Sequence, residues 1–429
     1  MREQLVLILA YHFPPENVIG AARPFRWYKY LRRLGYACHV ITAADVSSRP
    51  DLAATYICDP FLKNPHAGRG WQLELIVRKL LLPGVNGTRW SVGAAHAAAE
   101  LIHRNPDMDI TLLSTYPPLG THLAAYWIAR RYRVPWIADF RDPLAGNPGS
   151  GDINSFNAGI YRLVEQVVIA SADQVIVNTD AIQSALRARY PKHAPKVHLI
   201  WNGFDPEEKL NPSPIPDRPR RVFRHIGELY EGRDISPLLL SIDRLIGTRR
   251  LDPASFQLHL VGPVRTGCLP PEQFVSQAEA QGWLKLTATQ LPRTEAQQLM
   301  QSSDGLLLVQ PHSAVQVPGK LFEYIQIGRP ILAFVPPNSA TERILSRSNI
   351  LFRCAYSSSS TREFDERVLS FFDLPSESRP PSAWFDAEFN AESHAEALAR
   401  LIDDSRKQPV NKALEPQRVH HTVVEHPRQ

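Results

Sequence analysis

The sequence of 429 residues contains only four cysteines and lacks any long hydrophobic run. The cysteines are far apart and form no CxxC pair, which argues against a disulfide framework or a zinc site and favours a reducing cytoplasm. No segment approaches the ~20 apolar residues that span a bilayer, and the apolar stretch at residues 5–10 is too short for a signal peptide. We therefore expect a cytoplasmic protein that is soluble or lies on the inner face of the plasma membrane.

The sequence also lacks dense runs of positive charge. Lys and Arg number 48 against 43 Asp and Glu, a net charge of +5. Their scattered positions argue against a nucleic-acid-binding arm, and the small excess fits nucleotide phosphates or an acidic membrane surface equally well. With 44% hydrophobic and 21% charged residues the chain is globular, and its length favours two domains over one.

Strand-like and helix-like patterns alternate along the whole chain. The run LVLILAY, residues 5–11, is continuously apolar, as a strand buried on both faces requires. Further strands are predicted at residues 38–43, 110–115, 135–140, 174–179, 196–202, 222–229, 256–262, 284–289, 305–310 and 331–336. This alternation is typical of doubly wound α/β layers, in which ligands bind outside the carboxyl ends of the strands.

A proline-rich stretch divides these strands into two series. Five prolines between residues 206 and 219 indicate an interdomain linker. We therefore predict the following organisation: an N-terminal domain at 1–205, a linker at 206–220, a C-terminal domain at 221–381, a closing helix at 382–406 and a disordered tail at 407–429.

Loops after strands in both halves carry glycine next to arginine. In the first half, the loop of residues 12–23 ends where a helix is expected to start, with Gly20 just before it; this glycine serves either a turn or a close approach to a ligand. In the second half, Gly227 ends a strand and Arg233 precedes a helix, where a guanidinium either grips a diphosphate or pairs with a neighbouring carboxylate. Gly262 and Arg265 repeat this geometry.

Two groups of carboxylates are candidates for a catalytic or metal-binding site. Asp107 and Asp109 have a spacing that can hold a divalent cation, but they precede a strand and so lie at the wrong end for the cleft; we expect a solvated turn. Asp139, Arg141 and Asp142 stand at the carboxyl end of a buried strand, where they either perform proton or oxocarbenium chemistry or form a structural network.

In the segment PGKLFEY, residues 318–324, a Pro-Gly pair that interrupts regular structure is followed by a positively and a negatively charged residue. Pro318 and Gly319 predict a helix start whose free N–H groups face an anion, and Lys320 adds positive charge. Glu323 lies about one turn further on the same face, where its carboxylate can accept hydrogen bonds from vicinal ribose hydroxyls. Both charges are explained if a nucleotide lies across this turn.

Together these segments make the chain resemble family 4 glycosyltransferases, retaining enzymes of the GT-B fold with two Rossmann-like domains facing a central cleft. The resemblance runs from residues 11–42 through 135–143 and 225–234 to 318–335. It implies transfer of a sugar from a nucleotide-sugar donor with retention of configuration, and no metal or other cofactor. It also implies that Gly20 belongs to the N-domain glycine loop.

The resemblance further implies donor-binding roles in the C-terminal half, with one departure from the family pattern. Arg233 and Lys320 match positions at the diphosphate, and Glu323 matches the position at the ribose. Many members carry Glu-x7-Glu, and the first of these glutamates corresponds to Val315, which cannot accept a sugar hydroxyl. We expect a replacement from Gln316, His312 or the backbone around Pro318–Gly319.

Residues 71–90 combine apolar side chains with cations, among them Trp71, Arg78 and Lys79. This segment is either an interfacial helix that collects a lipid-linked acceptor or a core helix with solvated charges. On the whole sequence we expect a glycosyltransferase acting on a cell-surface glycan or its lipid-linked precursor. Two alternatives are a GT-B nucleotide-sugar epimerase and a non-catalytic nucleotide-sugar-binding protein.

Overall fold

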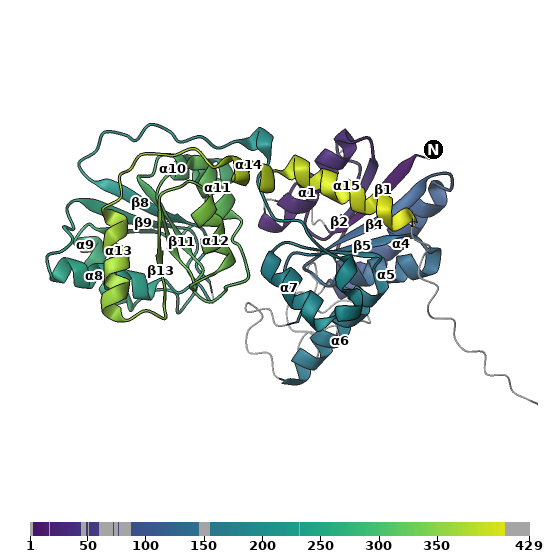
Figure 1. Cartoon of the computed structure of the whole chain (residues 1–429), viewed down its shortest axis with the longest axis horizontal. Helices are drawn as coiled ribbons and strands as arrows, with labels where there is room; N and C mark the ends of the chain where they lie inside the picture. Colours follow the sequence, from purple (N-terminus) through teal and green to yellow (C-terminus); the bar gives the residue numbers. More distant parts are fainter. Residues whose placement is uncertain are drawn as a thin grey trace, which may run out of the picture.

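The protein folds into two α/β domains that lie side by side, as the computed structural model shows (Figure 1). The structure describes residues 3–16, 18–43, 49, 51–59, 72, 76, 87–145, 155–230 and 232–407. In both domains, every pairing between neighbouring strands of the described chain is parallel. The expected doubly wound architecture is confirmed.

The N-terminal domain contains a seven-stranded sheet within the described residues, in the order β3-β2-β1-β4-β5-β6-β7. Its strands are β1 (Gln4–Ala10), β2 (Ala37–Ala43), β3 (Ala54–Ile57), β4 (Asp109–Tyr116), β5 (Trp136–Phe140), β6 (Gln174–Val177) and β7 (Val197–Leu199). Its helices are α1 (Ile19–Arg33), α4 (Thr88–Arg104), α5 (Gly120–Tyr132), α6 (Ser155–Ser171) and α7 (Asp180–Arg189). The short edge strand β3 was missed by the sequence analysis.

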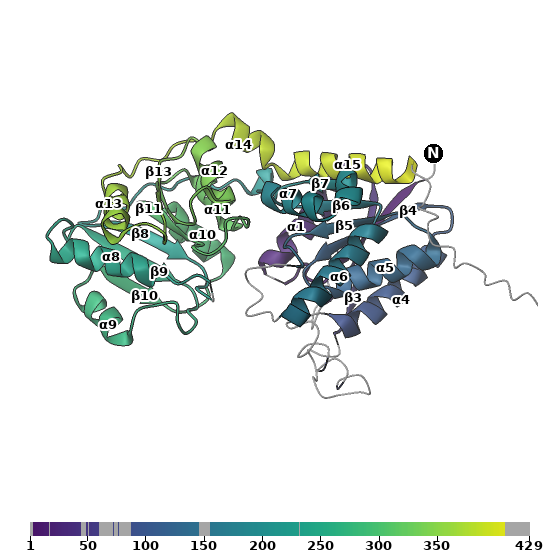
Figure 2. The same cartoon turned by 60° about the horizontal axis from the view of Figure 1, so that its bottom comes forward.

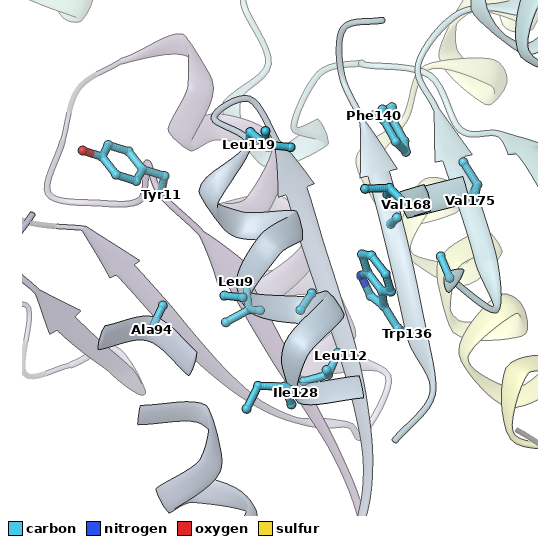
Figure 3. Close-up of a cluster of buried hydrophobic side chains, with 14 of the residues drawn as sticks. Leu9, Tyr11, Ala94, Leu112, Leu119, Ile128, Trp136, Phe140, Val168 and Val175 are labelled. Atoms are coloured by element: carbon cyan, nitrogen blue, oxygen red, sulfur yellow. The ribbon is translucent and has the colours of Figure 1, made fainter. Parts of the chain in front are cut away.

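The apolar run of β1 is buried on both faces of this sheet. Leu5, Leu7 and Leu9 pack in a cluster with residues of α4 and α5, whereas Val6 and Ile8 pack with residues of α1 and of the C-terminal helix α15 (Ala391–Lys407). Figure 3 shows the first of these clusters, where side chains from the strands meet those of α5. Because successive side chains point to opposite faces, only a continuous apolar sequence satisfies both layers.

The C-terminal domain contains a six-stranded sheet in the part of the chain that is described, in the order β10-β9-β8-β11-β12-β13. Its strands are β8 (Arg221–Ile226), β9 (Phe256–Val261), β10 (Leu284–Thr287), β11 (Gly305–Val309), β12 (Ile331–Phe334) and β13 (Phe352–Ala355). Its helices are α8 (Ser236–Gly247), α9 (Glu272–Ala280), α10 (Arg293–Gln301), α11 (Lys320–Ile327), α12 (Ala340–Arg347), α13 (Thr361–Phe372) and α14 (Ala383–Glu388). Strand β13 was not predicted from the sequence.

The chain crosses between the domains twice, and the two crossings are hydrogen-bonded to each other. The amide of Phe204 donates to the carbonyl of Phe389 at 3.0 Å, and the amide of Ala391 donates to the carbonyl of Phe204 at 3.0 Å. A Cβ at Gly203 would lie 1.9 Å from the Phe389 carbonyl oxygen, so this close approach requires glycine. The paired crossings bring the two sheets into a fixed relation.

The segment predicted as one closing helix, residues 382–406, forms two helices instead. Helix α14 ends at Glu388 and α15 begins at Ala391, because Phe389 and Asn390 take part in the crossing. Helix α15 then returns to the N-terminal domain and lies along α1, as both views show (Figure 1, Figure 2). The predicted tail from 408 onward lies outside the described residues.

Candidate active site

A cleft of about 780 Å³ lies between the two domains. Its walls include residues that follow strands of both sheets: His12 after β1, Asp142 after β5, Asn178 after β6, Arg233 after β8 and Gln310 after β11. The cleft therefore lies at the carboxyl ends of the strands. In each sheet the chain reverses its winding direction beside the first strand, at β1/β4 and at β8/β11, which is where open α/β sheets bind their ligands.

Gly20 lines this cleft, but it does not lie in a loop before the helix as predicted. Helix α1 begins at Ile19, so Gly20 is its second residue, and Pro24 falls inside the helix. Because proline has no N–H, the carbonyl of Gly20 is left without its helical donor. The guanidinium of Arg141 donates to it at 2.5 Å, which ties the start of α1 to the end of β5. A Cβ at Gly20 would lie 3.1 Å from this same guanidinium.

Asp139 does not face the cleft, and the prediction of a catalytic role for it was wrong. Its side chain is fully buried, and both carboxylate oxygens accept hydrogen bonds from Arg23 at 2.9 Å. Arg23 also donates to the carbonyls of Ile200 and Trp201. A buried carboxylate needs such a charged partner. The pair therefore joins α1 and β5 to the first interdomain crossing and is structural.

Arg141 and Asp142 both line the cleft, and their surroundings differ. The guanidinium of Arg141 donates to the carbonyls of Gly20, Tyr116 and Pro117, so its hydrogen bonds hold backbone in place. Burial raises the pKa of the Asp142 carboxyl, while Arg141 and a hydrogen bond from Gln316 oppose this shift. Of the three residues predicted to be catalytic, Asp142 is the carboxyl that faces the cleft.

In the C-terminal domain Arg233 lies on the cleft wall and Arg265 does not. Arg233 stacks over the ring of Tyr230 at 4.5 Å, and its buried Nε has no hydrogen-bond partner among the described residues. Arg265 is 69% exposed and forms an ion pair with Glu228 at 2.7 Å. The prediction that Arg265 binds the donor is therefore not supported, because its side chain is engaged at the surface.

Helix α11 begins at Lys320, directly after Pro318 and Gly319, as the sequence predicted. Lys320 packs against Gly227 and donates to the carbonyl of Ile226; a Cβ at Gly227 would lie 1.5 Å from the lysine Nζ, so this packing requires glycine. Burial, together with the charge of Arg233, lowers the pKa of Lys320 to about 8, and Glu323 opposes the shift. The two cations therefore face the same space.

We expect the pKa of Lys320 to make nucleoside-diphosphate binding sensitive to pH. Because its pKa is about 8, Lys320 is charged at pH 7 and loses its proton as the pH rises toward 9. Affinity for a nucleoside diphosphate should fall over this window. Calorimetry at pH 7, 8 and 9 tests this, with Lys320→Met as the control that should show a flatter profile. Parallel profiles for both proteins would contradict the assignment.

Glu323 lies one turn after Lys320 and lines both the main cleft and an adjoining pocket of about 250 Å³. Gln297 donates to its carboxylate at 3.4 Å, and Arg293 lies 3.8 Å away. Arg293 is bound more closely to Glu208 of the linker, at 2.7 Å. The Glu323 carboxylate is thus a quarter exposed and only loosely held, which leaves it available to a ligand.

Val315, which stands where many family members carry a glutamate, is not part of the cleft wall. His312 and Gln316, the expected replacements, both line the cleft. The amide of Gln316 donates to Asp142 at 2.9 Å, across the cleft. Sequence reasoning missed several further polar residues of the walls, among them Asn178 and Gln310. Each directly follows a strand of the structure and lies near the carboxyl end of a predicted strand, and this position was the available signal.

Asp107 and Asp109 lie away from the cleft, at the amino end of β4, as the sequence predicted. Asp109 pairs with Arg406 of α15. In the described portion of the chain, no group of three or more His, Cys, Asp or Glu side chains could hold a metal ion. Trp71, Arg78 and Lys79 lie outside the described residues. No helix of the described ranges is long and apolar enough to cross a membrane.

Comparisons with known proteins agree with this geometry. The family model for Glycosyltransferase Family 4 matches residues 25–208, and no curated protein sequence gives a significant match. Anabaena HepE, solved in complex with UDP and glucose, matches with a TM-score of 0.59 and 13% identity over 94% of this chain and 100% of its own. The lipopolysaccharide outer core galactosyltransferase WaaB matches with a TM-score of 0.57 and 12% identity, over 94% and 99%.

A third structure, the UDP-GlcNAc 2-epimerase from Methanocaldococcus jannaschii, matches with a TM-score of 0.53 and 11% identity over 94% of this chain and 99% of its own. At such identities these structures establish the fold alone, over 94% of the chain, and the family model applies to residues 25–208. The chain therefore has the GT-B fold, and its residues 25–208 match Glycosyltransferase Family 4.

Proposed function

We propose that the protein transfers a sugar from a nucleotide-sugar donor to a hydroxyl of a glycan or lipid-linked acceptor, with retention of configuration and without a metal. The observation that carries this proposal is the grouping of Arg233, Lys320 and Glu323 on one wall of the interdomain cleft. The two cations suit a diphosphate and the carboxylate suits ribose hydroxyls. Solved neighbours of the same fold hold UDP and UDP-glucose, which supports a nucleotide sugar as the donor.

For retention of configuration, the acceptor oxygen forms its bond to the anomeric carbon on the same face from which the diphosphate oxygen departs as its own bond to that carbon breaks. Negative charge develops on the leaving diphosphate, where Arg233 and Lys320 stabilise it. Asp142 lines the opposite wall, where its carboxylate can receive the proton of the acceptor hydroxyl.

A panel of nucleotide sugars tests the proposal. A ligand that binds the folded state raises its melting temperature, so thermal shift identifies the donor and transfer is then assayed with glycan and lipid-linked acceptors. We expect donor binding followed by acceptor-dependent transfer. Conversion of the donor to another free nucleotide sugar without acceptor would identify an epimerase instead. Tight binding with neither transfer nor hydrolysis would identify a non-catalytic binding protein.

We further propose a role in cell-surface polysaccharide biosynthesis at the inner face of the plasma membrane, through the cationic segment 71–90. The protein should co-sediment with anionic vesicles at low salt, and salt should weaken this binding by screening the charges. Replacing Arg78 and Lys79 by Glu should abolish it. The same charge change at Lys285 and Arg362, exposed residues of the C-terminal domain, is the control that should retain it. If the wild-type protein ignores such vesicles, the acceptor is delivered from solution.

A further inference from the structure

Two buried amide side chains from opposite domains line the cleft, and each has an oxygen without a hydrogen-bond partner among the described residues. Asn178 is 7% exposed and directly follows β6 of the N-terminal sheet. Gln310 is 8% exposed and directly follows β11 of the C-terminal sheet. Both residues line the cleft, and the Asn178 Oδ1 and Gln310 Oε1 atoms have no partner among the described residues.

Such atoms call for an explanation, because a buried acceptor without a hydrogen bond costs free energy. An apolar side chain of similar size would fill either position without this cost. Each oxygen is an acceptor and therefore needs an O–H or N–H donor. The cleft itself is the place from which a ligand can supply one.

A short chain of side-chain hydrogen bonds crosses the cleft beside these oxygens. The amide nitrogen of Gln310 donates to Gln316 Oε1 at 3.4 Å, and the amide nitrogen of Gln316 donates to Asp142 Oδ1 at 2.9 Å. Gln316 lies only two residues before Pro318, where the phosphate-facing turn begins. The sugar of a donor held at that turn must therefore lie beside this chain.

We propose that Asn178 and Gln310 accept hydrogen bonds from hydroxyl groups of the transferred sugar, and that Gln316 orients Gln310 for this contact. This inference rests on the proposed function. It explains how the site recognises a sugar although Val315 occupies the position of the usual glutamate and is absent from the cleft wall. Both domains then contact one sugar.

The chemistry of this pair selects the class of sugar. Two neutral acceptor oxygens require hydroxyl or amide hydrogens, which an ionised carboxylate or phosphate on the sugar does not offer. Asp142 follows β5, the strand paired with β6, and adds a carboxyl on the same side as Asn178. The transferred sugar should therefore present hydroxyl or amide hydrogens, and no carboxylate or phosphate, at the edge facing these residues.

The test uses variants that keep side-chain size but lose the oxygen: Asn178→Leu and Gln310→Met. Each should bind the nucleoside diphosphate as the wild type does but lose about tenfold in affinity for the nucleotide sugar, the effect of one hydrogen bond left unmade. The ligand-free variants should melt no earlier than wild type, because an unpaired buried acceptor has been removed. Gln4→Met is the matched control, since Gln4 Oε1 is also unpartnered but lies at the amino end of β1.

Deoxygenated donors identify the hydroxyl concerned. Removal of the hydroxyl that Gln310 accepts should cost the wild type about tenfold and cost Gln310→Met nothing further. Additive losses, or variants whose nucleotide-sugar affinity equals that of wild type, would overturn the inference. So would variants in which only the KM for the acceptor rises, because the oxygens would then serve the acceptor sugar. If the wild type binds no nucleotide sugar at all, the proposed function itself fails.

Discussion

Arg233→Ala should weaken binding of both the nucleotide sugar and the free nucleoside diphosphate by about 1.5–3 kcal/mol, the range for hydrogen bonds to charged groups. Arg233 lines the cleft, and its buried Nε has no hydrogen-bond partner among the described residues. Its guanidinium carbon lies 4.5 Å from the centroid of the Tyr230 ring. Such a side chain is oriented in advance for a diphosphate. Titration calorimetry with the nucleoside diphosphate measures the effect directly.

Two further variants separate charge from geometry at this position. Arg233→Lys should recover only part of the affinity, because lysine keeps the charge but loses the planar fork. Arg265→Ala is the matched control, since Arg265 also follows a glycine after a strand but pairs with Glu228 at the surface. Unchanged nucleotide affinity in Arg233→Ala, or an equal loss in Arg265→Ala, would contradict the assignment.

The parts of the fold that sequence reasoning predicted are those controlled by local patterns. The apolar run of β1 could only fit a strand covered on both faces, and helices do cover both. The break at Pro318–Gly319 predicted the start of α11, because its residues are incompatible with a continuing helix or strand. In both places nearby residues determine the structure, so the pattern alone suffices.

The errors arose where residues distant in sequence determine the structure. Asp139 was expected in the cleft because it ends a strand beside Asp142, but it is paired with Arg23, 116 positions away. Helix α1 was expected to begin at Pro24, yet it begins at Ile19, because Arg141 satisfies the carbonyl that Pro24 leaves free. Neither partner can be identified from local sequence.

The polar walls of the cleft were missed for a related reason. Asn178 and Gln310 lie near the carboxyl ends of predicted strands. A polar amide at such a position is expected at the protein surface, so neither residue stood out in the sequence. They become informative only once the two domains are placed on either side of the cleft. Each residue is then buried, and its amide oxygen has no hydrogen-bond partner in the described chain. The sequence thus predicted some charged residues of the cleft wall, Arg233, Lys320 and Glu323 among them, but neither of these two neutral ones.

Glu323 and Lys320 should respond differently to substitution, because they are assigned to different parts of the donor. Glu323→Gln should cost less affinity than Glu323→Ala, since the amide keeps one acceptor for the ribose hydroxyls. Lys320→Ala should reduce the transfer rate as well as binding, because negative charge builds on the departing diphosphate. Measurement of kcat and of donor affinity for each variant tests this division. Equal losses in both quantities for all three variants would argue against it.

The same assignment predicts that transfer needs no metal ion, since Arg233 and Lys320 provide the positive charge at the diphosphate. A chelator should therefore leave activity nearly intact, and Asn at both Asp107 and Asp109 should have little kinetic effect. These two residues lie at the amino end of β4, away from the cleft, where Asp109 pairs with Arg406. Three results together would contradict this prediction: a chelator abolishes transfer, Mg²⁺ or Mn²⁺ restores it, and the variant with Asn at both positions is inactive. The leaving diphosphate would then be neutralised by a cation, and α11 would not be the phosphate-facing helix.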